Sequence, residues 1–113
     1  MCAALIAVHA VFMLVHVVMW KLKEFACGAS RQENAQKMKE KLEALVGVVP
    51  QLKSATVGVD FKHTDMSYDA VLISRFESEE DLAAYKTHPA HVEISTYCKK
   101  VRESRVACDF VIE

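Results

Sequence analysis

The sequence lacks paired cysteines. Its four cysteines, Cys2, Cys27, Cys98 and Cys108, stand far apart along 113 residues, and none belongs to a C-x-x-C pair or to a zinc-ligand spacing. The arrangement is typical of reduced thiols in a cytosolic protein. It therefore predicts a cytoplasmic location.

The sequence also lacks an excess of charge of either sign. It has 14 lysines and arginines against 15 aspartates and glutamates, for a formal net charge of -1. A domain that binds nucleic acid usually carries a basic surface, so the balance predicts no nucleic-acid partner. With 52% hydrophobic residues in 113, the chain is long enough for one domain with a modest core.

The long apolar run at the N-terminus lacks the basic start of a secretory signal. From Met1 to Trp20 the chain is apolar apart from two histidines, which is a length that could suit a membrane span. The end of the run reads better as a β-strand. We favour a natural start at Met13, with 1–13 as an apolar extension and 14–113 as the domain, over a spanning helix or a signal. No membrane partner is predicted.

Turning to what is present, four short segments are rich in β-branched and aromatic residues or alternate between apolar and polar. Polar turns or helical patterns separate them. The predicted strands are Leu14–Leu22, Leu52–Phe61, Tyr68–Phe76 and Ser104–Ile112.

Capping signals mark the helices. Ser30 stands three residues before a glutamate, the spacing of a capping box, and opens a predicted helix over Arg31–Val46. Ser78, followed by three acidic residues, opens a short helix to Tyr85. Pro89 then suits the first turn of a further helical segment over Ala90–Val101.

The order of these elements predicts an α+β, ferredoxin-like βαββαβ fold with a four-stranded antiparallel sheet. Its helices can cover only one face of that sheet. The third predicted strand is apolar on both faces, with Leu72 on one and Ile73 on the other, so an apolar surface would stay open to water. Two sheets packed face to face would bury it, which predicts a homodimer, or a larger ring of dimers.

Longer segments of the chain are distinctive. They are HVVMWKLKE at 16–24, KEKLEALVGVVPQLKS at 39–54, VGVDF at 57–61, YDAVLISRFESEEDLAAYKTHPAHV at 68–92 and VRESRVACDF at 101–110. Together they resemble the stress-responsive A/B barrel (Dabb) family over nearly the whole chain from Leu14 onward. The resemblance implies a ferredoxin-like protein that dimerises into an α/β barrel.

The resemblance also implies a candidate site. A plant polyketide cyclase of this family closes its substrate by an aldol condensation without a cofactor, with a tyrosine and a histidine as the catalytic pair. Tyr85 and His91 occupy those two positions here, and His16 matches a pocket histidine of the first strand. A further pocket histidine of that enzyme is not matched, since this chain has Tyr68-Asp69-Ala70 there.

From the residues themselves, His91 could act as a general base on a carbon acid, while Tyr85 hydrogen-bonds the developing enolate. His88 and His16 are predicted to line the pocket, although a histidine beside Pro89 could instead cap a helix. His88 and His91 could share a metal ion, but no third ligand of fixed spacing accompanies them. We therefore expect no metal and no cofactor.

Three functions follow from these observations. The first is a small apolar-ligand pocket, working as a cofactor-free cyclase, isomerase or lyase on a carbonyl compound. The second is a non-catalytic stress or structural dimer. The third and weaker one is a monooxygenase that shares the dimeric fold.

Overall fold

The computed structural model describes residues 12–113, so the predicted apolar extension lies almost wholly outside the described residues. Within this part of the chain, no helix is both long and apolar enough to span a membrane. The elements follow the predicted order along the chain. Their bounds are β1 Met13–Leu22, β2 Phe25–Ala26, β3 Ala29–Ser30, α2 Arg31–Glu43, β4 Ser54–Val59, β5 Ala70–Phe76, α3 Glu79–Thr87, α4 Pro89–Val101 and β6 Arg102–Ile112.

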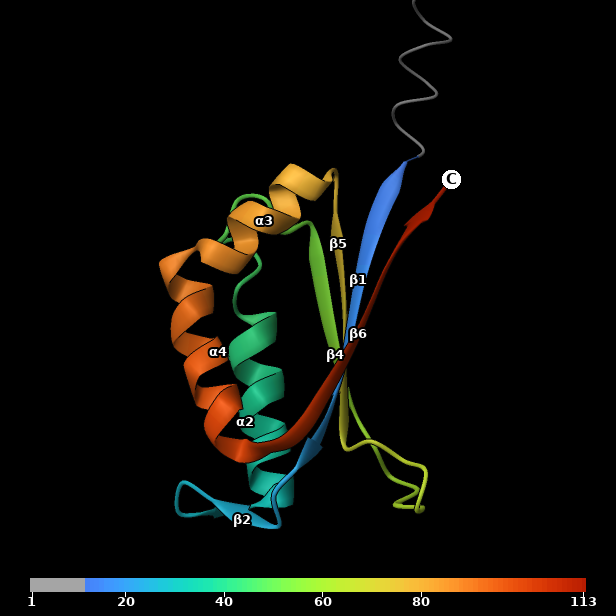
Figure 1. Ribbon diagram of the computed structural model, residues 1–113. Coiled ribbons are helices and arrows are strands. Elements are labelled where there is room, and N and C mark those ends of the chain that lie inside the picture. The colour runs from blue at the N-terminus through green and yellow to red at the C-terminus, as the bar shows by residue number, and fades with distance from the viewer. Residues whose placement is uncertain (1–11) are drawn as a thin grey trace, which may run out of the picture.

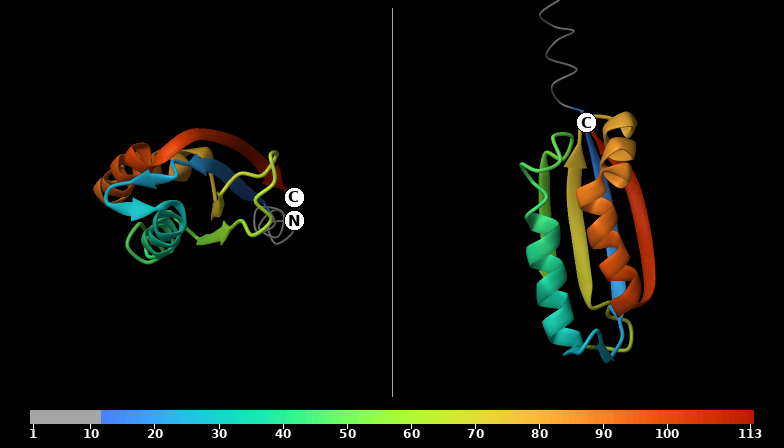
Figure 2. Two further views of the ribbon diagram at one scale, coloured as in Figure 1. Left: turned by 90° about the horizontal axis from the view of Figure 1, so that it is seen from below. Right: turned by 90° about the vertical axis from the view of Figure 1, so that its left-hand side faces the viewer.

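The four long strands form one antiparallel sheet in the order β4-β5-β1-β6, and β2 pairs with β3 in a small separate hairpin. Figure 1 shows α2, α3 and α4 together on one side of the sheet, with the other side bare. Seen from the helix side, α2 and α4 run along the strands that they cover (Figure 2). This arrangement is ferredoxin-like and confirms the predicted fold class.

The register between strands decides which residues share a face of the sheet. His16 of β1 lies opposite Asp109 of β6, and both belong to the face that the helices cover. The next residue, Val17, lies opposite Cys108 of β6 and Ile73 of β5 on the bare face. Successive residues of a strand point to opposite faces, so alternate side chains of β1 lie on the helix side and on the bare side of the sheet.

The hydrophobic core lies between the sheet and the helices. Met38 and Leu42 of α2, Leu72 and Phe76 of β5, and Val101 at the end of α4 are all buried in it. Burial of each large apolar side chain stabilises the fold by roughly 1.5–3 kcal/mol. This packing holds the helices, and with them the side chains that face the sheet, in fixed positions.

The start of α2 confirms the predicted capping box. The backbone N–H of Glu33 donates to the Ser30 hydroxyl at 3.2 Å, and the Glu33 carboxylate accepts from the Ser30 N–H at 3.0 Å. The helix ends at Glu43 and not at Val46 as predicted. The Val46 N–H bonds the Glu43 carbonyl, only three residues back, and Gly47 follows with a φ of 90° that ends the helical path.

Several strand boundaries differ from the prediction by one or two residues, and β1, β4 and β5 start at Met13, Ser54 and Ala70. The second long strand stops at Val59, and Phe61 lies beyond it with 83% of its surface exposed. The Asp60 N–H still bonds the Asp69 carbonyl at 2.9 Å, which closes the turn between β4 and β5. The last strand starts at Arg102, two residues early, because this residue takes extended backbone angles directly after α4.

Candidate active site

A cavity of about 350 Å³ lies between the sheet and the helices. Residues from β1, β5 and β6 form one wall, and residues from α2, α3 and α4 form the other. Its apolar lining consists of buried side chains: Val18, Trp20, Leu42 and Leu72. A volume of this order suits one small organic molecule.

Three of the four predicted site residues meet in this cavity. His16 comes from β1, Tyr85 from α3 and His91 from α4, and all three side chains line it. The rings of Tyr85 and His91 are in contact, with 4.3 Å between their centroids and planes inclined at 45°. The break between α3 and α4, visible in Figure 1, brings these two residues to the same place.

His91 is held in one protonation pattern. Its Nδ1 lies 3.1 Å from the carbonyl oxygen of Lys86, and because a carbonyl only accepts, Nδ1 carries the proton. The other ring nitrogen, Nε2, is then free to accept a proton. Burial lowers the pKa of His91 below its ordinary 6.5, against the raising effect of that hydrogen bond, and the nearby His16 lowers it further. The imidazole is therefore neutral, and a base, near pH 7.

Tyr85 is buried under α3, with only 1% of its surface exposed. Its ring packs against Phe76 of β5 at a centroid distance of 5.1 Å. Burial raises the pKa of its hydroxyl to about 12, so the group keeps its proton and can donate a hydrogen bond. Tyr85 and His91 thus supply a donor and a base side by side.

His16 has a partner that sequence reasoning missed. Its Nδ1 donates a hydrogen bond to the carboxylate of Asp109, which lies directly across the β1–β6 pairing. Burial is the largest influence on His16 and lowers its pKa, while Asp109 acts in the opposite direction. The carboxylate fixes the ring orientation of a histidine that is only 3% exposed.

The signal for Asp109 was present in the alternation of the last strand. The apolar set Val106, Cys108 and Phe110 marks one face, so the residues between them belong to the other. That second face carries Asp109 toward β1, and the antiparallel pairing places it opposite His16. A register for the β1–β6 pair was needed to see this, and the sequence alone does not supply one.

His88 was predicted to line the pocket, and the structure corrects this. It is absent from the cavity lining, and its Nδ1 accepts a hydrogen bond from the Ala90 N–H at 3.1 Å. His88 is the N-cap of α4, with Pro89 in the first turn. The capping alternative therefore describes this residue, because its ring turns back onto the backbone of its own helix.

Metal ligands and thiols are the remaining reactive groups to locate around the cavity. Among residues 12–113, no group of three or more histidine, cysteine or acidic side chains is placed to hold a metal ion. Cys98 lines the cavity, but burial raises its thiol pKa to about 11, which keeps it protonated and poorly nucleophilic. The tyrosine and the two histidines are the titratable groups with a defined geometry in the cavity.

Similar proteins agree with this fold. The profile of the stress responsive A/B barrel domain matches residues 14–112. The curated stress-response A/B barrel domain-containing protein DABB1 of Arabidopsis thaliana is 40% identical over 58 residues. That match covers 51% of this chain but only 24% of the relative, so the similarity spans about a quarter of the relative's length.

Solved structures give the same result. A dimeric protein of unknown function with a ferredoxin-like fold from Bacteroides fragilis is 26% identical, with a TM-score of 0.77, over 87% of this chain and 94% of that one. The hydroxynitrile lyase of Passiflora edulis is 18% identical, with a TM-score of 0.74, over 89% and 94% of the two chains, a likeness that shows the fold alone. The profile match covers most of the chain, and the protein belongs to the stress responsive A/B barrel domain family.

Proposed function

We propose that the protein is a homodimeric enzyme that removes a proton from the carbon next to a carbonyl group in a small, largely apolar compound. Cyclisation, isomerisation and lyase reactions can all begin with this step. One observation carries the proposal: a single cavity holds Tyr85 and His91 in contact, above an apolar floor. The two groups need no cofactor for the step.

The chemistry assigns one role to each residue. The free Nε2 of His91 takes the α-proton, the electron pair of the broken C–H bond forms the double bond of the enolate, and the carbonyl π pair moves to the oxygen. The Tyr85 hydroxyl donates a hydrogen bond to that oxygen as negative charge develops on it. A hydroxyl with a pKa of about 12 stabilises the enolate as a donor while keeping its own proton. The proton held by His91 can then return to a different atom of the intermediate.

His16 supplies a second polar contact from the sheet side of the cavity. Its Nδ1–H is committed to Asp109, so its Nε2 is the atom left for a ligand. The ring is buried and is held by Asp109 from the neighbouring strand of the β1–β6 pair. We assign it the role of orienting the substrate between the apolar floor and the Tyr85–His91 pair.

The fold neighbours fit this proposal at a general level. The Passiflora edulis protein is named a hydroxynitrile lyase, so this fold can support a lyase. The Bacteroides fragilis protein is a dimer, and the bare apolar face of the present sheet suits the same assembly. The free thiols of Cys27, Cys98 and Cys108 favour a cytoplasmic location.

The alternative is a dimer without catalytic activity. The bare face favours it, because apolar residues such as Phe110 and Ile112 remain 44% and 45% exposed there and would stabilise an assembly whatever the cavity does. The two functions differ in one measurable respect. A structural dimer has no reason to exchange the α-protons of a ketone.

The test is therefore proton exchange on a probe ketone, 4-phenyl-2-butanone, followed by NMR in D₂O. We expect the protein to accelerate loss of the α-proton signals above the buffer rate. His91→Asn should lower the rate by about a hundredfold, since Asn keeps a donor for the Lys86 carbonyl but lacks the base. Tyr85→Phe should lower the rate by a similar factor, because the hydrogen bond to the developing enolate is lost.

The dimer and the melting temperature should change little in both variants, which separates catalysis from folding. Exchange at the buffer rate in the native protein, or at the native rate in both variants, would reject the enzymatic function. The structural dimer would then be the better account.

A further inference from the structure

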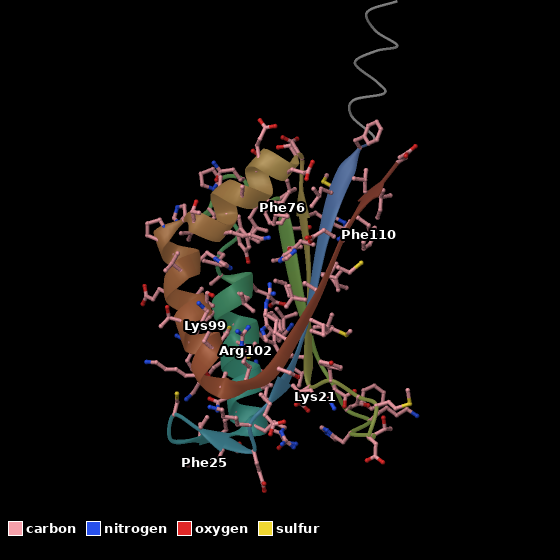
Figure 3. The ribbon with its side chains drawn as sticks, in the orientation of Figure 1. Lys21, Phe25, Phe76, Lys99, Arg102 and Phe110 are labelled. Carbon is pink, nitrogen blue, oxygen red and sulfur yellow. The ribbon has the colours of Figure 1, made fainter. Side chains whose placement is uncertain are left out.

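The cavity has a cationic side that the proton-transfer chemistry does not use. Four basic residues line it, namely Lys86 of α3, Lys99 of α4, and Arg102 and Arg105 of β6. Three of them are exposed and Arg102 is half-buried, whereas the apolar lining is fully buried. Figure 3 labels Lys99 on α4 and Arg102 where that helix passes into β6. The cations thus lie toward the solvent end of the cavity.

These four charges have no counter-ion within residues 12–113. Ion pairs do form elsewhere in this part of the chain, for example between Lys39 and Glu43 at 2.8 Å, but none involves the four cavity cations. No aspartate or glutamate lines the cavity, and the adjacent Asp109 is engaged by His16. Such a concentration of one sign in a chain of net charge -1 is a local feature and not an effect of composition.

Helix dipoles account for only part of this arrangement. Lys86 and Lys99 lie in the last turns of α3 and α4, where cations favour the helix C-terminus. Arg105 has no such reason, because it lies within β6, opposite Trp20 of β1. Trp20 adds an unmet donor to the same wall: its buried indole N–H has no hydrogen-bond partner within the described residues. Donors and cations that converge on one space attract an anionic oxygen.

We propose that the substrate of this site is an apolar carbonyl compound that also carries an oxyanion, either a carboxylate or a phosphate ester, held by Lys86, Lys99, Arg102 and Arg105. The inference rests on the proposed function for the carbonyl chemistry and adds the class of substrate. The apolar body lies on Val18, Leu42 and Leu72, and the oxyanion lies at the cationic side. The reacting carbonyl lies between them, beside Tyr85 and His91.

The test uses three probes that share a phenyl-alkyl body: 5-phenylpentanoate, 5-phenylpentanamide and 4-phenylbutyl phosphate. Trp20 is the single tryptophan of the chain and lines the cavity, so its fluorescence reports binding directly. We expect at least one of the two acids to bind about tenfold more tightly than the neutral amide, and more so at low salt. The tighter of the two acids identifies the oxyanion.

Two neighbouring lysines provide a matched control. Lys99 lines the cavity and Lys100 does not, although both are exposed and lie in the last turn of α4. Lys99→Gln, and separately Arg105→Gln, should weaken acid binding by about two- to fivefold and leave amide binding unchanged. Lys100→Gln should change neither.

Equal affinity for acids and amide would overturn the inference, and so would an equal loss of acid binding in Lys99→Gln and Lys100→Gln. Neither result would touch the proton exchange of the probe ketone, so the proposed function would stand. No fluorescence change with any of the three probes would also overturn the inference, and the ketone exchange assay would still decide the proposed function. Acid binding that follows the pattern above, together with native exchange in His91→Asn, would keep the oxyanion site and reject the catalytic role.

Discussion

At the scale of single residues, two histidines three positions apart have different tasks. His88 faces its own backbone and caps α4, whereas His91, one turn further on, lines the cavity and contacts Tyr85. The difference follows from helix geometry, because the N-cap His88 has extended backbone angles whereas His91 lies inside the first turn of the helix. The family resemblance singled out His91 as the candidate base, and the structure adds that His88 caps the helix.

Replacing His88 should affect stability, and replacing His91 should affect proton transfer. His88→Ala removes the acceptor for the Ala90 N–H and should lower the free energy of unfolding by about 1 kcal/mol, with proton exchange on the probe ketone retained. His91→Asn should keep the free energy of unfolding and lose the proton exchange. Urea denaturation and the NMR exchange assay, run on the same samples, measure both. Loss of exchange in His88→Ala without loss of stability would contradict the assignment.

The two histidines of the cavity also predict a loss of stability in acid. Burial lowers the pKa of both His16 and His91 below 6.5 in the folded protein. Between those lowered values and 6.5 the unfolded chain binds protons that the folded chain does not, so the free energy of unfolding falls as pH falls through this window. Urea denaturation at pH about 7.5 and about 5.5 should show the decrease.

The His91→Asn variant serves as the control for this pH effect. It lacks one of the two groups, so its stability should decline less steeply over the same pH window. An unchanged slope would mean that His91 titrates in the folded protein as it does in the unfolded chain.

At the scale of elements, strand pairing brings into the site a residue that no sequence motif predicted. The antiparallel β1–β6 register puts Asp109 opposite His16, and Asp109 acts to raise the pKa of that histidine against the effect of burial. Asp109→Asn removes the negative charge, so the pKa of His16 should fall further below 6.5. Titration of the imidazole signals by NMR measures it. A rise would show that the carboxylate is not the partner.

The sequence predicted elements whose signals are local and did not predict those that depend on pairing. The capping box of Ser30 and Glu33 is encoded within four residues, and it forms as expected. Alternation separated the residues of β1 into two sets, but which set faces the helices was left open until the pairing was known. Asp109 could not be assigned in this way, because its contact with His16 joins residues 93 positions apart through a register.

The cavity itself was beyond sequence reasoning for a related reason. The family resemblance suggested Tyr85, His91 and His16 as a set, but neither the cationic side nor the volume could be read from spacing. Arg105 and Lys99 converge because α4 passes directly into β6, which places Lys99 on the helix wall and Arg105 on the sheet wall of the same cavity. Sequence signals predict each helix and strand separately. The shape of the cavity depends on how these elements pack together, which the signals do not contain.

At the scale of the whole molecule, the two faces of the sheet have different roles: one lines the cavity and the other is available for assembly. Alternate residues of β1 line the cavity, as His16, Val18 and Trp20 do, and their neighbours Val17 and Met19 lie on the bare face. A substitution on the bare face can therefore disturb assembly without touching the cavity. This separation makes the proposed dimer testable apart from the proposed reaction.

Val106 of β6 is suited to that test. It lies opposite Met19 on the bare face and is 40% exposed, while Val92 of α4, on the helix layer, is 48% exposed. Val106→Asp would bury an unpaired charge in a face-to-face dimer, so light scattering after gel filtration should show a shift from dimer to monomer. Val92→Asp should stay dimeric. A dimeric Val106→Asp protein of native stability, or a monomeric native protein, would place the interface elsewhere or remove it, and the bare apolar face would then need another explanation.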